Sequence, residues 1–438
     1  MARLGAGMRK MKDSGIEWIG QIPSDWMCCK QKYLITLLNG RAYKDSEFEE
    51  DGKYKILRVG NLFTNPVWYS SSLELEPNKY CQDGDLLYSW SMSYAPVIWH
   101  GEKVIYHYHI WKTVLSEKIS KMFAYYYLIS LTNALQAEIH ETTMGFITMG
   151  VMNNAYIAFP PLAEQQKIAA FLDEKCGEID SIRSDVQREI EILNDYKKSV
   201  ITEAVTGRLE ERTGFRSTDE RREKKWKDSR IPRIGKIPVE WGTSRIKYVC
   251  SVIGSGTTPS SGNVLYYEGS ENWIQSGDLY KKKYITETEK TVTDYAVSTI
   301  SALHKYKADF IVIAMYGASI GNVAISKIDA CVNQACCVIK PNSKVNFNYL
   351  YYTLINDKDI MLDMSIGGTQ PNISQAKILE LPVLLPPLSE QKAIADYLDE
   401  KCSEIDATIA DKQRQLETLD EYKKSLIFEY VTGKKKVS

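Results

Sequence analysis

A stretch of 48 residues occurs twice in this 438-residue chain, and this repeat constrains the fold more than any other feature. Residues 160–207 match residues 386–433 without gaps, and 29 of the 48 positions are identical. A shorter match pairs residues 11–26 with residues 226–241, where 9 of 16 positions are identical. The offsets of 226 and 215 differ by 11, so the second copy is 11 residues longer between the two matches. Self-similarity on this scale predicts two similar units in tandem, at residues 11–225 and 226–438.

The segments between the matching pieces, residues 27–159 and 242–385, can be aligned only over a few short stretches. One such stretch places residues 84–86 (GDL) beside residues 308–310 (ADF). Both segments contain short β-branched and aromatic runs separated by Gly, Asn, Ser and Pro, which predicts strand-rich modules. We interpret the two segments as one shared fold that carries two different surfaces. A duplication that kept the same function in both copies is the alternative that the residues leave open.

The repeated 48-residue segment predicts helix, because it begins with Pro-Pro and then lacks proline. Gly177, which is Ser403 in the second copy, predicts a break followed by a helix over about residues 178–205. Gly207 and Gly433 provide the stop. Apolar residues recur at spacings of three or four, which predicts a stripe that packs on another helix. The stripe consists of Ile179, Ile182, Val186, Ile190, Leu193, Val200 and Ala204, and in the second copy of Ile405, Ile409, Leu416, Leu419, Leu426 and Ile427.

A helix of about 28 residues is roughly 40 Å long, close to the ~34–36 Å that one turn of B-DNA puts between half-sites. Two such helices with matching stripes would pair most simply as an antiparallel coiled coil with one module at each end. An intramolecular hairpin without any measuring role fits the same spacing, so both interpretations stay open.

The formal net charge of −1 argues at first against a nucleic-acid partner. However, residues 161–209 hold 7 Lys and Arg against 10 Asp and Glu, and residues 387–433 hold 6 against 11. The two helical segments therefore carry −8, and the rest of the chain carries +7. The acidic helical segments thus offset a mild basic excess in the modules and linkers. The net charge of the whole chain therefore does not argue against DNA as a partner.

Nine cysteines without any Cys-x-x-Cys spacing predict free thiols, with neither a disulfide framework nor a zinc ribbon. His107 and His109 alternate on one predicted strand, but no third ligand follows at a diagnostic spacing, so no metal site is predicted. The sequence contains no run of 18 apolar residues and no secretory signal, which predicts a cytoplasmic protein.

Polar and aromatic residues in the predicted loops of the two modules are candidates for contacts to phosphates and base edges. For each of them, packing or a solvated turn is the alternative. In the first module the candidates are Arg58, Asn61, Ser89, Ser91, Tyr94, His109, Lys112, Thr142 and Thr143. In the second module they are Ser255, Thr257, Thr258, Gln275, Ser276, Lys281, Lys282, Lys283, Tyr316, Ser319, Thr369, Gln370 and Asn372.

Catalytic motifs are missing from the sequence. The loop at residues 254–256 (GSG) lacks the Gly-Lys-Ser/Thr ending of a phosphate-binding loop, and neither a nucleophile elbow nor a kinase set occurs. Residues 65–68 (NPVW) fall short of the Asn-Pro-Pro-aromatic motif of adenine methyltransferases. We therefore predict a protein without a catalytic site of its own.

Both copies contain Pro-Pro-Leu-x-Glu-Gln, then Leu-Asp-Glu-Lys, then Tyr-Lys-Lys-Ser, beginning at Pro160 and Pro386. In this order and number, the motifs resemble the specificity subunit of type I restriction-modification systems. Residues 18–23 (WIGQIP) and 234–238 (IGKIP) are similar to the opening segments of that family, and residues 317–325 (GASIGNVAI) are similar to one class of its target-recognition domains. The likeness covers essentially the whole chain, although the first module matches it less clearly.

The resemblance implies an α+β fold with a pseudo-two-fold repeat, in which two strand-rich α/β target-recognition domains are separated by two long antiparallel coiled-coil helices. Each domain would bind one half of an asymmetric, bipartite site in double-stranded DNA. The helices would set the gap and bind two methyltransferase subunits, and restriction and translocase subunits would join them in phage defence. S-adenosylmethionine, ATP and Mg would be bound by these partners, with no cofactor in this chain. As partner-binding candidates we select Ile179, Ile182, Val186, Leu193, Tyr196, Ile405, Leu419 and Tyr422.

The motifs also serve as landmarks for the domain boundaries. We expect an opening segment at 1–26, target-recognition domain 1 at 27–160, a central helical spacer at 161–209, a linker with the second opening segment at 210–241, target-recognition domain 2 at 242–386, and a C-terminal helical spacer at 387–438. A self-contained DNA methyltransferase or nuclease is an alternative that the missing motifs oppose. A duplicated adhesive scaffold that does not bind DNA is a further one.

Overall fold

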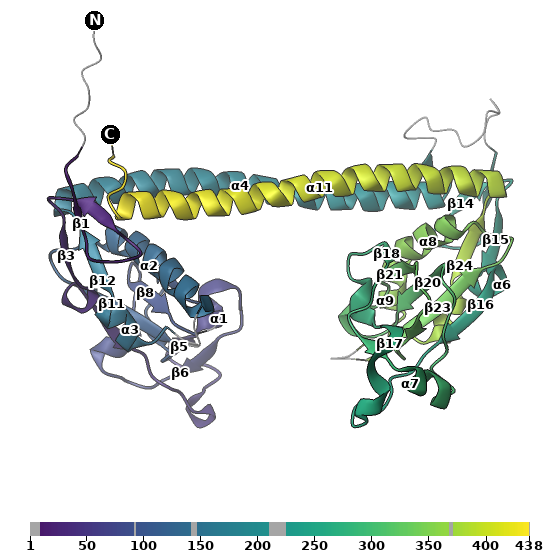
Figure 1. Ribbon diagram of the computed structural model, residues 1–438, viewed down its shortest axis with the longest axis horizontal. Helices are drawn as coiled ribbons and strands as arrows, with labels where there is room; N and C mark the ends of the chain where they lie inside the picture. The colour runs from purple at the N-terminus through teal and green to yellow at the C-terminus, as the bar shows by residue number, and fades with distance from the viewer. Residues whose placement is uncertain (1–8, 92, 142–146, 210–224, 368–370, 438) are drawn as a thin grey trace, which may run out of the picture. The chain divides into compact units, whose positions relative to one another are not determined.

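The computed structural model describes residues 9–91, 93–141, 147–209, 225–367 and 371–437. The chain divides into two compact units (Figure 1). Unit 1 comprises Met1–Gln187 and Gln413–Ser438, and unit 2 comprises Arg188–Lys412. Each unit therefore contains one variable module and a part of both repeated helical segments.

The repeated segments form two long helices, α4 (Leu162–Val205) and α11 (Leu388–Val431), of 44 residues each. The predicted break at Gly177 is wrong, because α4 runs through it. A helical glycine costs only about 1 kcal/mol relative to alanine, which the flanking helix formers outweigh. The match between a 28-residue helix and one turn of DNA also fails, since 44 residues correspond to roughly 66 Å. No helix in the described part of the chain is long and apolar enough to cross a membrane.

The two helices pair in antiparallel orientation within each unit, as expected. Residue numbers rise along α4 where they fall along α11, as their ion pairs show. These include, in unit 1, Asp180–Lys423 (2.6 Å) and Arg183–Asp420 (2.7 Å), and, in unit 2, Lys197–Asp406 (2.6 Å) and Glu189–Lys412 (2.5 Å). The pairs Asp180–Lys423 and Lys197–Asp406 lie at equivalent positions of the repeat, because both partners are offset by 226 residues.

Burial divides the partner-binding candidates into two groups. Ile179, Val186 and Ile405 are buried. These three residues pack the helices and present no surface to another subunit, so their selection was wrong. Ile182, Tyr196 and Tyr422 are exposed, and Leu193 and Leu419 are half-buried.

Unit 1 contains two four-stranded sheets, in the orders β4-β11-β8-β9 and β6-β5-β10-β7. Its strands are β1 (Met11–Asp13), β2 (Gln21–Pro23), β3 (Met27–Lys30), β4 (Ile35–Asn39), β5 (Tyr54–Leu57), β6 (Tyr69–Ser71), β7 (Tyr80–Cys81), β8 (Leu86–Ser89), β9 (Ala95–Ile98), β10 (Val104–Tyr106), β11 (Ile110–Leu115) and β12 (Tyr156–Phe159). Its shorter helices are α1 (Val59–Phe63), α2 (Lys121–Glu141) and α3 (Met149–Asn154). Strand β10 pairs with β5 in parallel, and β1-β2 and β3-β12 form two small antiparallel pairs.

Unit 2 contains a five-stranded sheet, β16-β23-β20-β21-β18, and a three-stranded sheet, β19-β17-β22. Its strands are β13 (Trp226–Asp228), β14 (Lys236–Pro238), β15 (Gly242–Arg245), β16 (Cys250–Ser255), β17 (Tyr267–Ile274), β18 (Tyr284–Ile285), β19 (Thr291–Val292), β20 (Phe310–Ala314), β21 (Val323–Ser326), β22 (Cys331–Val332), β23 (Cys336–Pro341) and β24 (Pro382–Leu385). Its shorter helices are α6 (Ile246–Val249), α7 (Asp294–Thr299), α8 (Phe347–Asn356), α9 (Lys358–Asp363) and α10 (Gln375–Leu379).

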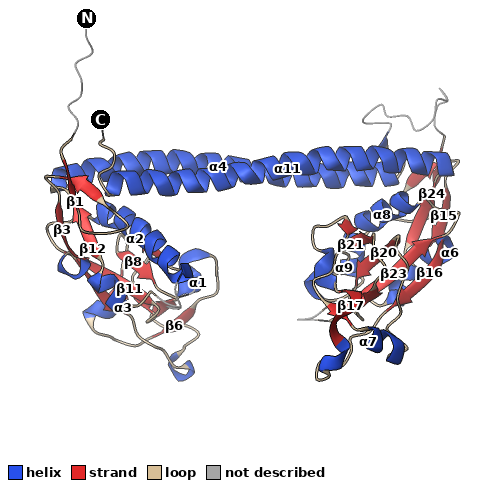
Figure 2. Cartoon of the chain, viewed as in Figure 1, coloured by secondary structure: helices blue, strands red, loops and turns tan. Residues whose placement is uncertain are grey.

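The two modules share one topology. The antiparallel core β4-β11-β8-β9 of unit 1 corresponds to β16-β23-β20-β21 of unit 2, and the parallel pair β5-β10 corresponds to β17-β22. In unit 1, α2 packs beside the edge strand β9, and in unit 2, α8 packs beside β21 (Figure 2). The expectation of one fold in both variable segments is therefore confirmed.

Each long helix ends on the opening segment of the unit in which it ends. Gly433, with a φ of 72°, follows α11, and a Cβ atom there would stand 2.4 Å from Cδ of Pro23. Gly207, with a φ of 82°, follows α4, and its Cβ would stand 2.7 Å from Cδ of Pro238. Both positions need the left-handed backbone and the missing side chain of glycine. The predicted glycine stops are confirmed.

The glutamine of the Pro-Pro-Leu-x-Glu-Gln motif joins the start of each long helix to its module. In unit 2, Oε1 of Gln391 accepts from the backbone N–H of Asn346 (2.7 Å), and its Nε2 donates to the carbonyl oxygens of Lys344 (3.3 Å) and Pro386 (2.9 Å). In unit 1, Gln165 makes the same three contacts with Ser120, Lys118 and Pro160. Both glutamines are buried.

Candidate nucleic-acid interface

The loops of unit 2 gather around one turn, residues 333–335, which we call hub turn 2. It joins the end of the parallel strand β22 to β23. The backbone N–H of Asn333 donates to the carbonyl of Ile274 (2.9 Å) and that of Cys336 to the carbonyl of Asn333 (3.2 Å). Oδ1 of Asn333 accepts from the backbone N–H of Ala335 (3.1 Å). The turn is therefore held by its own side chain and by the neighbouring strand.

Backbone contacts bring the four candidate loops of unit 2 to this turn. A Cβ at Gly256 would stand 1.7 Å from the carbonyl oxygen of Val332, so the first loop lies directly against β22. The second loop begins after Ile274, whose carbonyl accepts from Asn333 of the turn. The third loop begins at Met315, whose N–H donates to the carbonyl of Ala335 (2.8 Å). The fourth is joined to the third, because Gly317 donates to Pro371 (2.8 Å).

Unit 1 repeats this arrangement at residues 107–109, which we call hub turn 1. The N–H of His107 donates to Leu57 (2.9 Å), and that of Ile110 donates to His107 (2.9 Å). In place of the Asn333 amide, Nδ1 of His107 accepts from the backbone N–H of His109 (3.5 Å). Gly40 takes the place of Gly256, since its Cβ would stand 2.4 Å from the carbonyl oxygen of Tyr106.

These contacts show which residue of one module corresponds to which residue of the other, including where the two sequences are too different to be aligned. The pairing of residues 84–86 with residues 308–310 is wrong by one position. Gly84 corresponds to Asp309, because both have a positive φ, 79° and 61°, and each donates its backbone N–H to the neighbouring strand segment, Gly84 to Trp99 (2.8 Å) and Asp309 to Ser326 (3.0 Å). The N–H of Trp90 donates to His109, as that of Met315 does to Ala335, which fixes the same register. An aspartate tolerates the left-handed region better than most residues, so it can stand where the first module has glycine.

Several candidates of unit 2 lie together around hub turn 2. Tyr316 is exposed, and a bridge joins it to Asn372. The other candidates on the loops that meet the turn are Ser255, Thr257, Thr258, Gln275, Ser276 and Ser319. Lys281 and Lys282 are exposed farther along the second loop. Thr369 and Gln370 lie outside the described residues, as do Thr142 and Thr143 of the first module.

Lys283 does not belong to this surface. Its Nζ forms an ion pair with Asp399 of α11 at 2.5 Å and lies over the rings of Tyr351 and Tyr352, 5.4 and 5.2 Å from their centroids. Asp399 also accepts from the hydroxyl of Tyr352 (2.6 Å). The lysine therefore holds the module to the helix, and we drop it as a DNA contact.

In unit 1 the structure also removes candidates. Ser89 is fully buried. Both ends of the Asn61 amide are used inside its own loop, where Oδ1 accepts from Arg58 N–H (3.2 Å) and Nδ2 donates to the carbonyls of Asn65 and Val67. Arg58 is exposed and lies over the ring of Tyr69 (4.9 Å). Arg58 and Gln275 occupy equivalent positions, immediately after the parallel strands β5 and β17.

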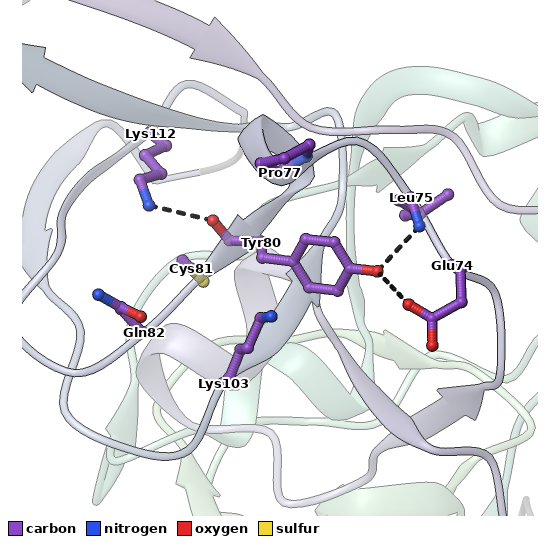
Figure 3. Close-up of a pocket in the computed structure, with 8 residues that line it drawn as sticks. All are labelled: Glu74, Leu75, Pro77, Tyr80, Cys81, Gln82, Lys103 and Lys112. Carbon is purple, nitrogen blue, oxygen red and sulfur yellow. Dashed lines mark hydrogen bonds between the residues drawn. The ribbon is translucent and has the colours of Figure 1, made fainter.

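Lys112 of β11 lines a hollow of about 450 Å³, together with Lys103 and with residues before, in and after β7 (Figure 3). Its Nζ pairs with Asp85 (2.6 Å) and donates to the carbonyl of Tyr80 (3.1 Å). Nζ of Lys103 lies 4.3 Å from the centre of the Tyr80 ring, and the Tyr80 hydroxyl contacts Glu74 (3.3 Å). The Lys112 ammonium is thus satisfied inside the module, which makes it a structural residue.

Aromatic rings support hub turn 1. The rings of Tyr88, Trp111 and Trp90 stack with neighbouring centroids 5.6 Å apart, and His109 packs edge-on against Trp90. Ser91 and Tyr94 follow Trp90 and are half-buried. The described residues contain no group of three or more His, Cys, Asp or Glu that could hold a metal ion. His109 is half-buried between Tyr108 and Trp90, and this partial burial lowers the pKa of its ring.

Replacing His107 by asparagine, the residue of hub turn 2, is expected to preserve the turn and remove a pH-dependent loss of stability. Burial, followed by the charges of His109 and Arg58, lowers the pKa of His107 to about 4, against about 6.5 in an unfolded chain. In this interval the unfolded chain binds the extra proton. The histidine's stabilising contribution is therefore complete above about pH 6.5 and lost as the pH falls towards about 4.

The check is urea unfolding of the wild type and of His107→Asn, at about pH 7 and about pH 5. The wild type should lose more stability on acidification than the variant does. An identical pH dependence in the two proteins would contradict the role of His107.

The residues at the apex of the hub turns, Tyr108 and Gln334, were not selected from the sequence, although both are exposed. Tyr108 lies in the run 107–112, beside the candidates His109 and Lys112, and Gln334 lies in the run 332–337 (VNQACC). The signal that could have found them is a short polar break between two apolar runs, which recurs in both copies at positions that differ by 226.

Comparison with known proteins decides the family. The model of the type I restriction modification DNA specificity domain matches residues 23–191 and again residues 238–418. The chain belongs to this family. As a specificity subunit of a type I restriction-modification system, it has one family domain in each copy of the repeat.

Relatives of this specificity subunit include two from Methanocaldococcus jannaschii. The MjaVIII specificity subunit is 25% identical over 442 residues, which cover 95% of this chain and 94% of the relative. The MjaIX specificity subunit is 34% identical over 192 residues, 43% of each chain. A solved structure described as the basis of complex assembly and conformational transition of the type I system has a TM-score of 0.67. It covers 94% of this chain and 98% of its own at 15% identity, which supports the fold.

Proposed function

We propose that each module of this specificity subunit reads one half of an asymmetric, bipartite site in double-stranded DNA. The observation that carries the proposal is the pair of hub turns, which share one backbone scaffold but present different side chains. On the loops that meet the turns, Arg58 in unit 1 corresponds to Gln275 in unit 2, and an arginine suits guanine where a glutamine suits adenine. Two unlike readers on one fold are what an asymmetric target requires. In this proposal the modules correspond to residues 27–160 and 242–386.

The paired helices would connect the readers and bind the catalytic partners. In this proposal two methyltransferase subunits, which carry S-adenosylmethionine, contact the helices, and restriction subunits that use ATP and Mg join the complex. Tyr196 and Tyr422 support this, because they occupy equivalent positions of the repeat and are 42% and 56% exposed. Exposed aromatic residues are enriched at protein interfaces. This chain would recognise DNA without catalysing a reaction, in the cytoplasm where the DNA is.

The test uses the chain assembled with its modification subunits and duplexes that carry both half-sites, as identified by methylation mapping of the cell's DNA. Adding or removing one base pair in the gap moves one half-site by about 3.4 Å and rotates it by roughly 35° around the duplex. We expect binding to weaken at least tenfold, measured by competition at fixed salt concentration.

The control is a duplex with the original gap but a changed gap sequence, which should bind like the parent. Equal binding to duplexes with shorter, original and longer gaps would contradict the spacer role of the helices. A complex that bound all duplexes equally, whatever their half-sites, would contradict sequence recognition itself.

A further inference from the structure

The apex of hub turn 2 is Gln334, an exposed residue between buried strands. The residues on both sides of it make hydrogen bonds within the protein. Asn333 closes the turn through its side chain, and Ala335 is buried with its carbonyl bound to Met315. In the part of the chain that the structure describes, no hydrogen bond to the Gln334 amide is found. The amide therefore presents a free donor and a free acceptor.

The loops around the turn give this amide a polar setting. Asn333 is joined to the strand that leads into Gln275, and Val332 lies against Gly256, next to Thr257. Met315, which leads into Tyr316, is bound to Ala335. Hydroxyl and amide side chains of this kind contact phosphates and sugars at protein–DNA interfaces and position the protein on the duplex. Gln334 stands at the point where all these loops meet.

Hub turn 1 has Tyr108 at the equivalent position, also exposed. Its backbone is held at least as firmly, because its N–H donates to Arg41 (3.1 Å) and its carbonyl accepts from Nε1 of Trp90 (2.8 Å). The two units thus present a phenol and an amide on the same rigid support. A difference in chemistry at a shared position, with the surrounding backbone unchanged, is the pattern of a residue that sets specificity.

We propose that the apex of each hub turn is a base-reading position, and that Gln334 recognises adenine in the half-site of unit 2. This inference rests on the proposed function and specifies the chemistry of the same surface. A side-chain amide can donate to N7 and accept from the N6 amino group of adenine in the major groove, a pattern that no other base presents. The rigid backbone of the turn lowers the conformational entropy that binding would cost.

The variants that test the inference are Gln334→Ala and Gln334→Glu. Losing a paired side-chain contact to a base costs about 1–3 kcal/mol of discrimination, which corresponds to roughly 5- to 150-fold in relative binding. Gln334→Ala should lose the preference for adenine at one position by this factor. Gln334→Glu is nearly the same size but only accepts hydrogen bonds, so the preference should move towards cytosine, whose N4 amino group donates.

The experiment assembles each full-length variant with its modification subunits and selects from a pool of duplexes randomised over both half-sites. Only one position in the half-site of unit 2 should change. Retained preference in the half-site of unit 1 shows that the variant complex is folded and assembled. Gln21→Glu is the matched control, since it makes the same chemical change at an exposed residue of β2, outside both hub turns and both long helices. Tyr108→Ala should alter the half-site of unit 1 alone.

Three outcomes would overturn the inference while the wild type still selects two half-sites. The first is an unchanged preference in both Gln334 variants. The second is a uniform weakening on all sequences, which would make Gln334 a phosphate contact. The third is a change at a position where the wild type does not select adenine. A wild-type complex without any sequence preference would instead contradict the proposed function.

Discussion

Replacing Arg233 by methionine is expected to lower the free energy of unfolding by about 3–5 kcal/mol, because it leaves a buried carboxylate without its partner. Arg233, between β13 and β14, donates through Nη1 to Oδ1 of Asp357 (2.9 Å), whose side chain is only 3% exposed. Burial raises the pKa of Asp357 to about 6, and Arg233 opposes this rise. The pair joins the second opening segment to the junction of α8 and α9.

The expected loss depends on pH in a defined direction. When a carboxyl group has a higher pKa in the folded protein than its unfolded value of about 3.8, the free energy of unfolding falls as the pH rises from the unfolded pKa to the folded one. Without Arg233 the folded pKa rises further, so the destabilisation should be greatest near pH 8 and smaller near pH 5. Urea unfolding at both pH values, with hydrogen exchange over residues 347–363, measures it.

The double variant Arg233→Met with Asp357→Asn serves as the control, because it removes the buried charge together with its partner. It should recover most of the stability that the single variant loses. A single variant as stable as the wild type near pH 8 would show that Asp357 does not need Arg233.

Gln391→Met should destabilise unit 2 by about 2–5 kcal/mol. The substitution keeps the volume but removes three hydrogen bonds, and it leaves the N–H of Asn346 and the carbonyls of Lys344 and Pro386 without this partner. Each buried polar group that loses its partner costs about 1–3 kcal/mol. The weakest point should be the contact between the start of α11 and the start of α8, where hydrogen exchange should speed up.

The repeat offers two comparisons for this variant. Gln165→Met breaks the equivalent clamp and should produce a similar loss, with faster exchange in unit 1 at α2. Gln415→Met makes the same change on the exposed face of α11 and should alter the free energy by less than about 0.5 kcal/mol. A similar loss from Gln415→Met and from Gln391→Met would contradict the clamp.

Much of the helical architecture could be predicted from local signals. The glycine stops at Gly207 and Gly433, the antiparallel pairing and the shared fold of the modules all follow from periodicity and repetition. The break at Gly177 was a wrong prediction, because one weak helix former cannot interrupt a long run of favourable neighbours. Residues of the apolar stripe such as Ile179 were assigned to partners although the chain's own second helix packs them.

Individual site residues were harder to predict, because a polar residue in a loop has the same local signature whether it faces solvent or closes a turn. Lys112 and Lys283 look like basic contacts in the sequence, yet each pairs with a carboxylate far away along the chain. Asn61 looks like a reader of bases and instead holds its own loop. Gln334 follows another polar residue, Asn333, so no local feature separates it from a residue of a solvated turn.

The sequence by itself determined that this protein consists of two related units with long helical segments, since self-similarity and apolar periodicity are properties of neighbouring residues. Only the tertiary structure decided which loops meet, which polar groups remain free, and which residues of the two modules correspond to one another. Those features depend on contacts such as Asn333 with Ile274 and Gly256 with Val332, between residues far apart in the chain. Hydrogen bonds of this kind form when strands pair, and no local pattern records their partners.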